Sequence, residues 1–215
     1  VKVLKTKYPQ GAEKQLIYAI TGREVPSGGL PADVGCIVQN IDTAVAIQRA
    51  VVDGRPLMRR IVTVTGGAIK EPKNFEVKLG TSYRELIEAA GGFVSEPVKI
   101  ISGGPMMGIA LSSLDVPIIK GSSAILCLSK EEADLPEERN CIRCGKCVSV
   151  CPMNLLPLQL NQYAVNYDVD KFEKCHGMDC IECGSCSFIC PAKRHLVQSI
   201  RTAKKTILNN RRKNA

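Results

Sequence analysis

Apolar residues recur at intervals of three and four positions in three stretches of the chain. These stretches are residues 12–20, 40–52 and 82–90. The interval matches the turn of an α-helix with one apolar face, so each stretch predicts a short amphipathic helix. Thr81 stands where the N-cap of the third helix is expected, and the glycine pair Gly91-Gly92 stands where this helix should end.

Other segments have the short apolar or alternating patterns of strands, with strict alternation at residues 75–79. Strands are predicted at residues 61–64, 75–79, 98–101 and 124–128. The pair Gly66-Gly67 predicts a turn that joins the first two strands as an antiparallel hairpin. The order strand, strand, helix, strand, with one closing strand, suggests a β-grasp-like domain of α+β class.

The length of the chain leaves room for more than one domain. It has 215 residues, and an acidic stretch over residues 131–138 separates the predicted strands from a cysteine-rich region. Pro136, among these charges, marks the expected boundary. No apolar run reaches the roughly 18 residues that cross a bilayer. The chain begins at Val1 without an initiator methionine or a leader, so a fragment of a longer protein is expected.

Eight of the eleven cysteines form two copies of the motif C-x2-C-x2-C-x3-C-P. The first copy is Cys141, Cys144, Cys147 and Cys151, and the second is Cys180, Cys183, Cys186 and Cys190. This is the spacing of bacterial ferredoxins with two [4Fe–4S] clusters. The first three thiolates lie on a tight loop around one face of the cluster, and Gly145 and Gly184 let backbone amides approach the sulfurs.

The fourth cysteine of each motif in such ferredoxins binds the other cluster. The expected ligands of cluster I are therefore Cys141, Cys144, Cys147 and Cys190, and those of cluster II are Cys180, Cys183, Cys186 and Cys151. Zinc is a less favoured alternative, because it has no use for a third cysteine at this spacing. Disulfides are less favoured still, because the chain carries no export signal.

Three cysteines lie outside the motifs. Cys127 falls in an apolar run and is expected to be a buried thiol, and the same is expected of Cys36. Cys175 fits no ligand position.

Four cationic residues lie beside the expected ligands. They are Arg143, Lys146, Lys193 and Arg194. Such cations raise the potential of an anionic cluster if they face it, but they have no such effect if they point to water. Both interpretations stay open.

The excess positive charge lies at the C-terminal end. Residues 193–215 hold eight basic and no acidic residues, and Leu196, Ile200, Ala203 and Ile207 form an apolar stripe. This segment is either an amphipathic surface for anionic lipid or an acidic partner, or a helix that covers the clusters with a solvated basic face. Nucleic-acid binding is not expected, because no aromatic residues interleave with the charge.

Several further segments, together with both cysteine motifs, resemble the C subunit of the Rnf electron-transport complex in the same order. They are KYPQGAE at residues 7–13, GREVP at 22–26, VQN at 38–40, TVTGG at 63–67 and GGPMMG at 103–108. The resemblance runs through essentially the whole chain.

This resemblance implies three domains. Residues 1–58 would be the end of a Rossmann-like FMN/NADH domain, residues 59–130 a β-grasp domain of the soluble-ligand-binding type, and residues 136–215 an α-helical two-[4Fe–4S] ferredoxin-like domain with a basic C-terminal helix. The glycine-rich loop that binds flavin and nucleotide in the family is expected upstream, so FMN and NAD(H) are implied for the full-length protein. Glu24 and Asn40 match residues that face FMN in the related complex I subunit. The alternative is that they are helix caps.

The family also implies a function and a location. It consists of peripheral subunits on the cytoplasmic side of the bacterial membrane, in a complex that couples electron transfer between ferredoxin and NAD to ion translocation. Implied partners are the other subunits and a ferredoxin-like electron carrier, and NADH would bind through the missing domain. The chain itself is expected to relay single electrons without a catalytic side chain. Alternatives are a soluble flavin and iron–sulfur reductase, such as a cobalamin reductase, or a ferredoxin with a docking domain.

Overall fold

The structure is a computed structural model that describes residues 1–133 and 137–213. The chain forms two compact units, one made of Val1–Gln39 with Glu137–Ala215, the other of Asn40–Pro136. The boundary expected at Pro136 lies outside the described residues.

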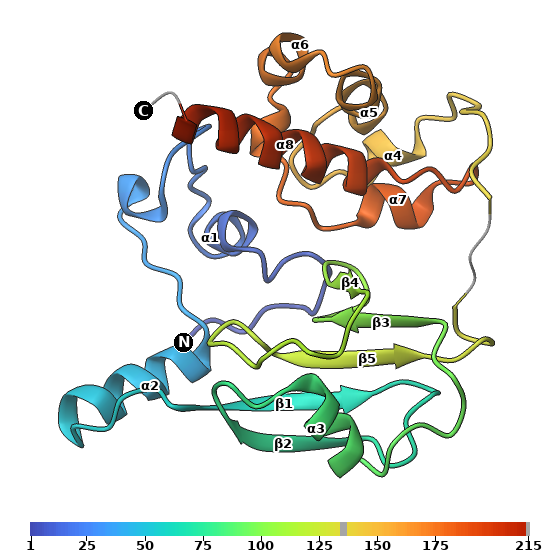
Figure 1. Cartoon of the computed structure of the whole chain (residues 1–215). Helices are drawn as coiled ribbons and strands as arrows, with labels where there is room; N and C mark the ends of the chain where they lie inside the picture. Colours follow the sequence, from blue (N-terminus) through green and yellow to red (C-terminus); the bar gives the residue numbers. More distant parts are fainter. Residues whose placement is uncertain (134–136, 214–215) are drawn as a thin grey trace. The chain divides into compact units, whose positions relative to one another are not determined.

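The second unit is built on a mixed five-stranded sheet with the order β2-β1-β5-β3-β4 (Figure 1). Its strands are β1 (Arg59–Thr65), β2 (Lys73–Lys78), β3 (Lys99–Ser102), β4 (Ile109–Leu111) and β5 (Ala124–Leu128). β1 pairs antiparallel with β2 and parallel with β5, while β3 pairs antiparallel with β4 and β5. The predicted hairpin and strands are confirmed. The sequence did not predict β4, because its three residues are too few to show an alternation.

The core of this unit lies between the sheet and α3 (Tyr83–Ala89). Tyr83, Leu86 and Ile87 are buried in one cluster with Val62 and Ile125 of the central strands. Burying each of these side chains contributes about 1.5–3 kcal/mol. The apolar residues that predicted the helix therefore lie on the face that packs against the sheet.

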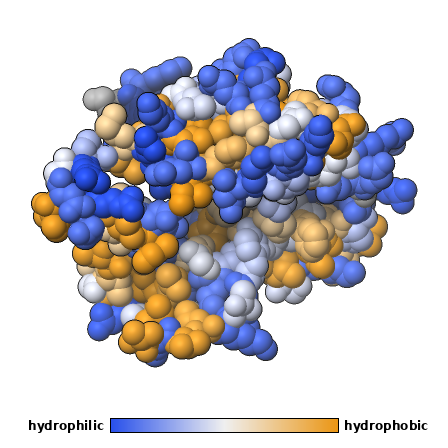
Figure 2. Space-filling model, turned by 90° about the horizontal axis from the view of Figure 1, so that it is seen from below, coloured by the Kyte–Doolittle hydropathy of each residue, from blue (hydrophilic) through white to orange (hydrophobic). Residues whose placement is uncertain are grey.

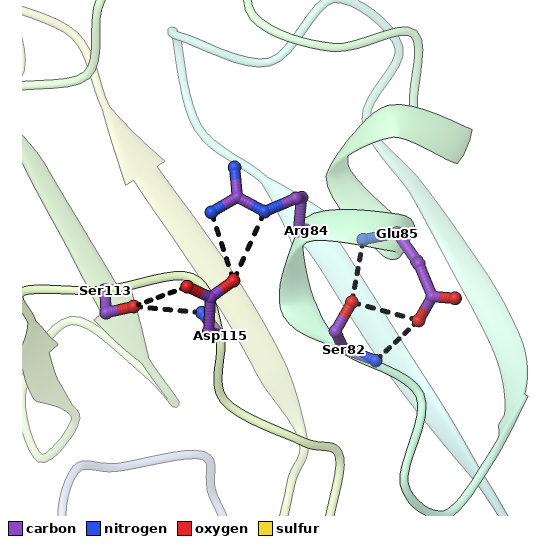
Figure 3. Close-up of polar contacts among 5 residues, drawn as sticks. All are labelled: Ser82, Arg84, Glu85, Ser113 and Asp115. Carbon is purple, nitrogen blue, oxygen red and sulfur yellow. Dashed lines mark hydrogen bonds and ion pairs between the residues drawn. The ribbon is translucent and has the colours of Figure 1, made fainter.

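A capping box fixes the start of α3 (Figure 3). Ser82 Oγ accepts a hydrogen bond from the Glu85 amide at 3.2 Å, and a Glu85 carboxylate oxygen accepts one from the Ser82 amide at 2.8 Å. The hydrogen bonds that the Ser82 amide and hydroxyl donate to the Glu85 carboxylate hold the pKa of Glu85 below its usual range. The N-cap is thus Ser82 and not Thr81, because only Ser82 has a glutamate three positions later that can return its hydrogen bond.

The other helix of this unit, α2 (Ile41–Val52), confirms the predicted helix but buries none of its residues. Val51 and Val52 are 79% and 70% exposed. Figure 2, seen from below, shows that apolar side chains gather on part of this face. Among the described residues, nothing covers the apolar face of α2.

The first unit is helical. It contains α1 (Glu13–Thr21), η1 (Pro31–Val34), α4 (Lys146–Ser149), α5 (Pro157–Val165), α6 (Val169–Lys174), η2 (Gly177–Asp179), α7 (Ser185–Ile189) and α8 (Leu196–Lys213). Leu160 of α5, Phe172 of α6, and Ile200 and Ile207 of α8 are buried together. The apolar stripe predicted for the C-terminal helix therefore packs inside this unit. Within residues 1–133 and 137–213, no helix is both long and apolar enough to cross a membrane.

The three cysteines outside the motifs differ in burial. Cys127 of β5 is fully buried, as predicted, and burial raises the pKa of its thiol to about 11. The prediction for Cys36 is wrong: it is only partly buried, because it follows η1 in a loop where its sulfur contacts the carbonyl of Val34. Cys175 is partly buried against the helical core.

Candidate metal centre

The two cysteine motifs adopt the same backbone path. In each, the residue before the second cysteine has a positive φ, 54° at Arg143 and 56° at Glu182. Its amide nitrogen lies 3.4 Å from the sulfur of the first cysteine, Cys141 or Cys180. Amide dipoles directed at these sulfurs stabilise the thiolate form that a metal centre requires.

The resemblance of the two paths continues to the fourth cysteine of each motif. Three residues after it, Asn154 and Lys193 again have positive φ, 53° and 54°. Their amides donate to the carbonyls of Cys151 and Cys190 at 3.2 Å and 3.1 Å. The two motifs are therefore structural repeats.

Each of two pockets is lined by four cysteines. One set is Cys141, Cys144, Cys147 and Cys190, and the other is Cys180, Cys183, Cys186 and Cys151. Each pocket combines three cysteines of one motif with the fourth cysteine of the other motif. These are the sets expected for clusters I and II, although their occupation by clusters stays a prediction.

The donor atoms and the lining of the pockets fit iron–sulfur clusters. The second pocket is otherwise lined by apolar residues and one glycine, and no described lining residue of either pocket carries a carboxylate or imidazole. Sets of four thiolates are what [4Fe–4S] clusters require. Within residues 1–133 and 137–213, no group of three or more His, Cys, Asp or Glu side chains is drawn together tightly enough to hold a single metal ion.

The protonated thiol is favoured at three of these cysteines. Burial, together with neighbouring cysteines, raises the pKa of Cys186 to about 12. Burial also raises the pKa of Cys180 and of Cys147. Ligation must therefore displace protons, which makes binding at these sets stronger as the pH rises.

The two loops differ in exposure. Cys141 and Cys144 are exposed, whereas Cys183 and Cys186 are only 7% and 8% exposed. Ile142, between the first two cysteines of the first loop, is 69% exposed. The first loop is open to solvent and the second is covered.

An ion-pair network from α8 covers the second loop. Glu182 accepts a hydrogen bond from Arg201 Nε at 2.7 Å, and Lys204 Nζ lies 3.2 Å from its other carboxylate oxygen. Lys204 also donates to the carbonyl of Cys180 at 2.5 Å. Only 15–26% of these three charged side chains is exposed, so the pairs are weakly screened. The network holds the side chain of Glu182 against α8.

The N-terminal segment covers the same loop. The Tyr8 hydroxyl donates to the carbonyl of Cys183 at 2.5 Å. Gln15 Nε2 donates to the carbonyl of Pro152 at 2.8 Å, and Ser27 Oγ donates to Asp179 at 2.6 Å. No signal in the sequence pointed to these contacts, because their partners are more than a hundred residues apart.

Three families match successive parts of the chain. They are the Nuo51 FMN-binding domain over residues 1–49, the SLBB domain over residues 61–110 and the 4Fe-4S dicluster domain over residues 140–194. The last match includes every cysteine of the two pockets.

Similar proteins are C subunits of one kind of complex. The chain is 57% identical, over 98% of its length, to the C subunit of the Na(+)-translocating ferredoxin:NAD(+) oxidoreductase complex of Acetobacterium woodii. It is 59% identical, over 94%, to that of the proton-translocating complex of Clostridium ljungdahlii. It is 44% identical, over 80%, to the C subunit of the ion-translocating oxidoreductase complex of Cronobacter sakazakii. The chain is homologous to these C subunits.

These matches confirm the resemblance to Rnf C subunits. The chain spans less than half the length of the relatives it matches, at 47%, 44% and 22% of them. Its α+β composition, with a mixed sheet in one unit, agrees with the three matched families.

The two residues assigned to the flavin edge belong to different units. Glu24 is exposed in the loop after α1. Asn40 is the N-cap of α2, where its side-chain oxygen accepts a hydrogen bond from the Asp42 amide at 2.9 Å. A contact of either residue with FMN stays a prediction, and for Asn40 the capping role is present.

Proposed function

We propose that this chain is the iron–sulfur relay of an ion-translocating ferredoxin:NAD oxidoreductase, and that it carries two [4Fe–4S] clusters with crossed ligands. Cluster I is held by Cys141, Cys144, Cys147 and Cys190, and cluster II by Cys180, Cys183, Cys186 and Cys151. The observation that carries the proposal is that each of these sets lines one pocket. The names of the relatives support the type of complex.

Bound clusters supply one-electron chemistry. The residues of the chain hold and tune them. The amides of Arg143 and Glu182 are directed at ligand sulfurs. Residues such as Leu155 and Ile200 exclude water from the cluster II pocket. The crossed ligands keep the two clusters close, which favours the passage of an electron between them.

The proposed division into domains follows the family matches. Residues 1–58 belong to a Rossmann-like FMN/NADH domain, residues 59–130 to a β-grasp domain and residues 136–215 to a ferredoxin-like domain. Glu24 and Asn40 lie at the edge of the FMN site. FMN and NAD(H) bind to the whole protein, and the match of residues 1–49 to an FMN-binding domain supports the flavin.

The proposed setting is the cytoplasmic face of a bacterial membrane. There the whole protein is a peripheral component that exchanges electrons with the other subunits and with a ferredoxin-like carrier. Support comes from the names of the relatives, which place them in ion-translocating complexes.

The function is tested on the whole complex, purified anaerobically from membranes of a host that produces the full-length protein. NADH is added, and the clusters are followed by EPR. We expect NADH to reduce them and oxidised ferredoxin to reoxidise them, with both effects lost in a Cys144→Ala, Cys183→Ala variant. If the full-length protein instead remains free of membrane partners and reduces a corrinoid by itself, it is a soluble reductase and the proposal is wrong.

A further inference from the structure

The first cysteine loop is exposed where it lines the cluster I pocket. Residues 137–146 are all exposed. Ile142 and Leu156 are 69% and 46% exposed, and Val148 is 37% exposed. Two of these apolar residues, Ile142 and Val148, line the cluster I pocket itself. An apolar contact area therefore lies directly over the pocket.

Cations surround this apolar area. Arg143 and Lys146 are exposed, and among the described residues neither side chain takes part in an ion pair. Arg139, two residues before Cys141, is also exposed. The acids of the same stretch are Glu137 and Glu138, and Glu138 already accepts a hydrogen bond from the His195 amide at 2.6 Å. The balance of charge at the loop is positive.

The second loop offers no such basic surface, although Phe188, which follows it, is 76% exposed. Its corresponding residues are Glu182, whose charge is paired with Arg201 and Lys204, and Ser185, which is partly buried. The hydroxyl of Tyr8 is bonded to this loop as well. Of the two pockets, only the first lies under an exposed and basic loop.

We propose that residues 141–146, with Val148 and Leu156, form the docking surface for an acidic protein that carries its own one-electron centre. This rests on the proposed function, because docking there is useful only if cluster I is present. The reaction is the transfer of one electron: one centre is oxidised as the other is reduced, and no bond or proton is exchanged. A partner with an acidic rim around an apolar centre complements this surface in charge and in polarity.

The difference between the two loops also indicates the order in which an electron passes through the two clusters. The covered cluster II site is bonded to the N-terminal segment, which matches the FMN-binding family, and the exposed cluster I site faces solvent. Cluster II is therefore the inner centre and cluster I the outer one. The acidic protein exchanges electrons with cluster I.

The test measures electron transfer from a reduced acidic bacterial ferredoxin to the full chain with reconstituted clusters, by stopped flow. The variant Arg143→Glu, Lys146→Ser gives the first loop the residues that the second loop has at the same positions, so the backbone conformation is known to accept them. The control Arg212→Glu, Lys213→Ser makes the same change in charge at the exposed end of α8. Dithionite reduction and iron content are measured on all three proteins.

At low ionic strength we expect the loop variant to react at least about tenfold more slowly than the wild type, with the control within about twofold. The difference should shrink as salt shortens the screening length. Equal slowing of both variants, or a wild-type rate that does not depend on salt, would overturn the docking surface. If the loop variant loses iron, Lys146→Ser alone, which leaves Arg143 in place, is compared with Lys213→Ser in the same salt series.

Two further outcomes separate this inference from the proposed function. A wild-type chain that takes up no iron and sulfide overturns both. A chain with intact clusters, and a loop variant that differs from the wild type only in binding to phosphatidylglycerol vesicles, would assign the cations to a membrane surface. That result would contradict the proposed docking surface but would agree with the proposed electron-relay function.

Discussion

The two cysteine loops share one backbone conformation but differ in their surroundings. Arg143 and Glu182 share a positive φ and an amide directed at a ligand sulfur. Around the first loop the side chains point to solvent, whereas the second lies under α8 and the N-terminal segment. The repeated motif therefore determines how each proposed cluster would be held, and the surroundings of each loop determine its exposure. Burial and cations act on cluster potential in opposite directions, so two clusters bound at these sites would not be equivalent.

The largest expected effect comes from breaking the crossed ligation. In Cys190→Ser, cluster I should be lost, although this cysteine belongs to the second motif. Iron should fall by about half, to about four atoms per chain, and the EPR signal should become that of a single cluster. Cys151→Ser is the matched control and should remove cluster II instead. If Cys190→Ser instead removes cluster II, each motif binds its own cluster, and the crossed ligand sets are wrong.

Removal of iron by a chelator should distinguish the two environments next. Cluster I lies under the exposed Cys141 and Cys144, whereas Cys183 and Cys186 are buried. We expect two phases of iron release, with the first at least several times faster. In Cys151→Ser, which should keep only cluster I, the slow phase should disappear. A single phase in the wild type would show that the difference in exposure has no effect.

A smaller effect is expected from the network that covers the second loop. Lys204→Met removes a cation beside Glu182 and the donor to the Cys180 carbonyl. It should lower the free energy of unfolding by about 1–2 kcal/mol and lower the potential of cluster II by on the order of tens of millivolts. Chemical denaturation and an EPR-monitored redox titration measure the two effects. A shift in the potential of cluster I alone would contradict the assignment of cluster II to the second loop.

The smallest effect is expected from the exposed ion pair at the other end of α8. Arg211 pairs with Glu173, and their side chains are 61% and 33% exposed. Arg211→Gln should therefore change the free energy of unfolding by less than about 1 kcal/mol and leave both cluster potentials unchanged. This variant is the control for Lys204→Met in the same titration. A larger effect than that of Lys204→Met would show that burial of the network contributes little.

The sequence predicted the parts of this molecule that depend on local patterns. Cysteine spacing is local, so it indicated all eight cysteines that line the pockets, and helical periodicity predicted α2 and α8. Ser82 was missed as the N-cap in favour of its neighbour, and β4 was too short to detect.

The difference between the loops was not predictable from the sequence. The contact of Arg201 with Glu182 spans 19 residues, and that of Tyr8 with Cys183 spans 175. Neither has a fixed spacing that a pattern could reveal. Arg143 and Glu182 occupy the same position of the same motif, and only the fold pairs one of them and leaves the other exposed.

The most direct test of the central claim is the iron and acid-labile sulfide content of the anaerobically reconstituted chain, with EPR after dithionite reduction. Two clusters held by the crossed cysteine sets predict about eight iron and eight sulfide per chain, and a spectrum of two interacting centres. Stoichiometric zinc with no reducible signal would contradict the account, because neither pocket would then hold a redox centre.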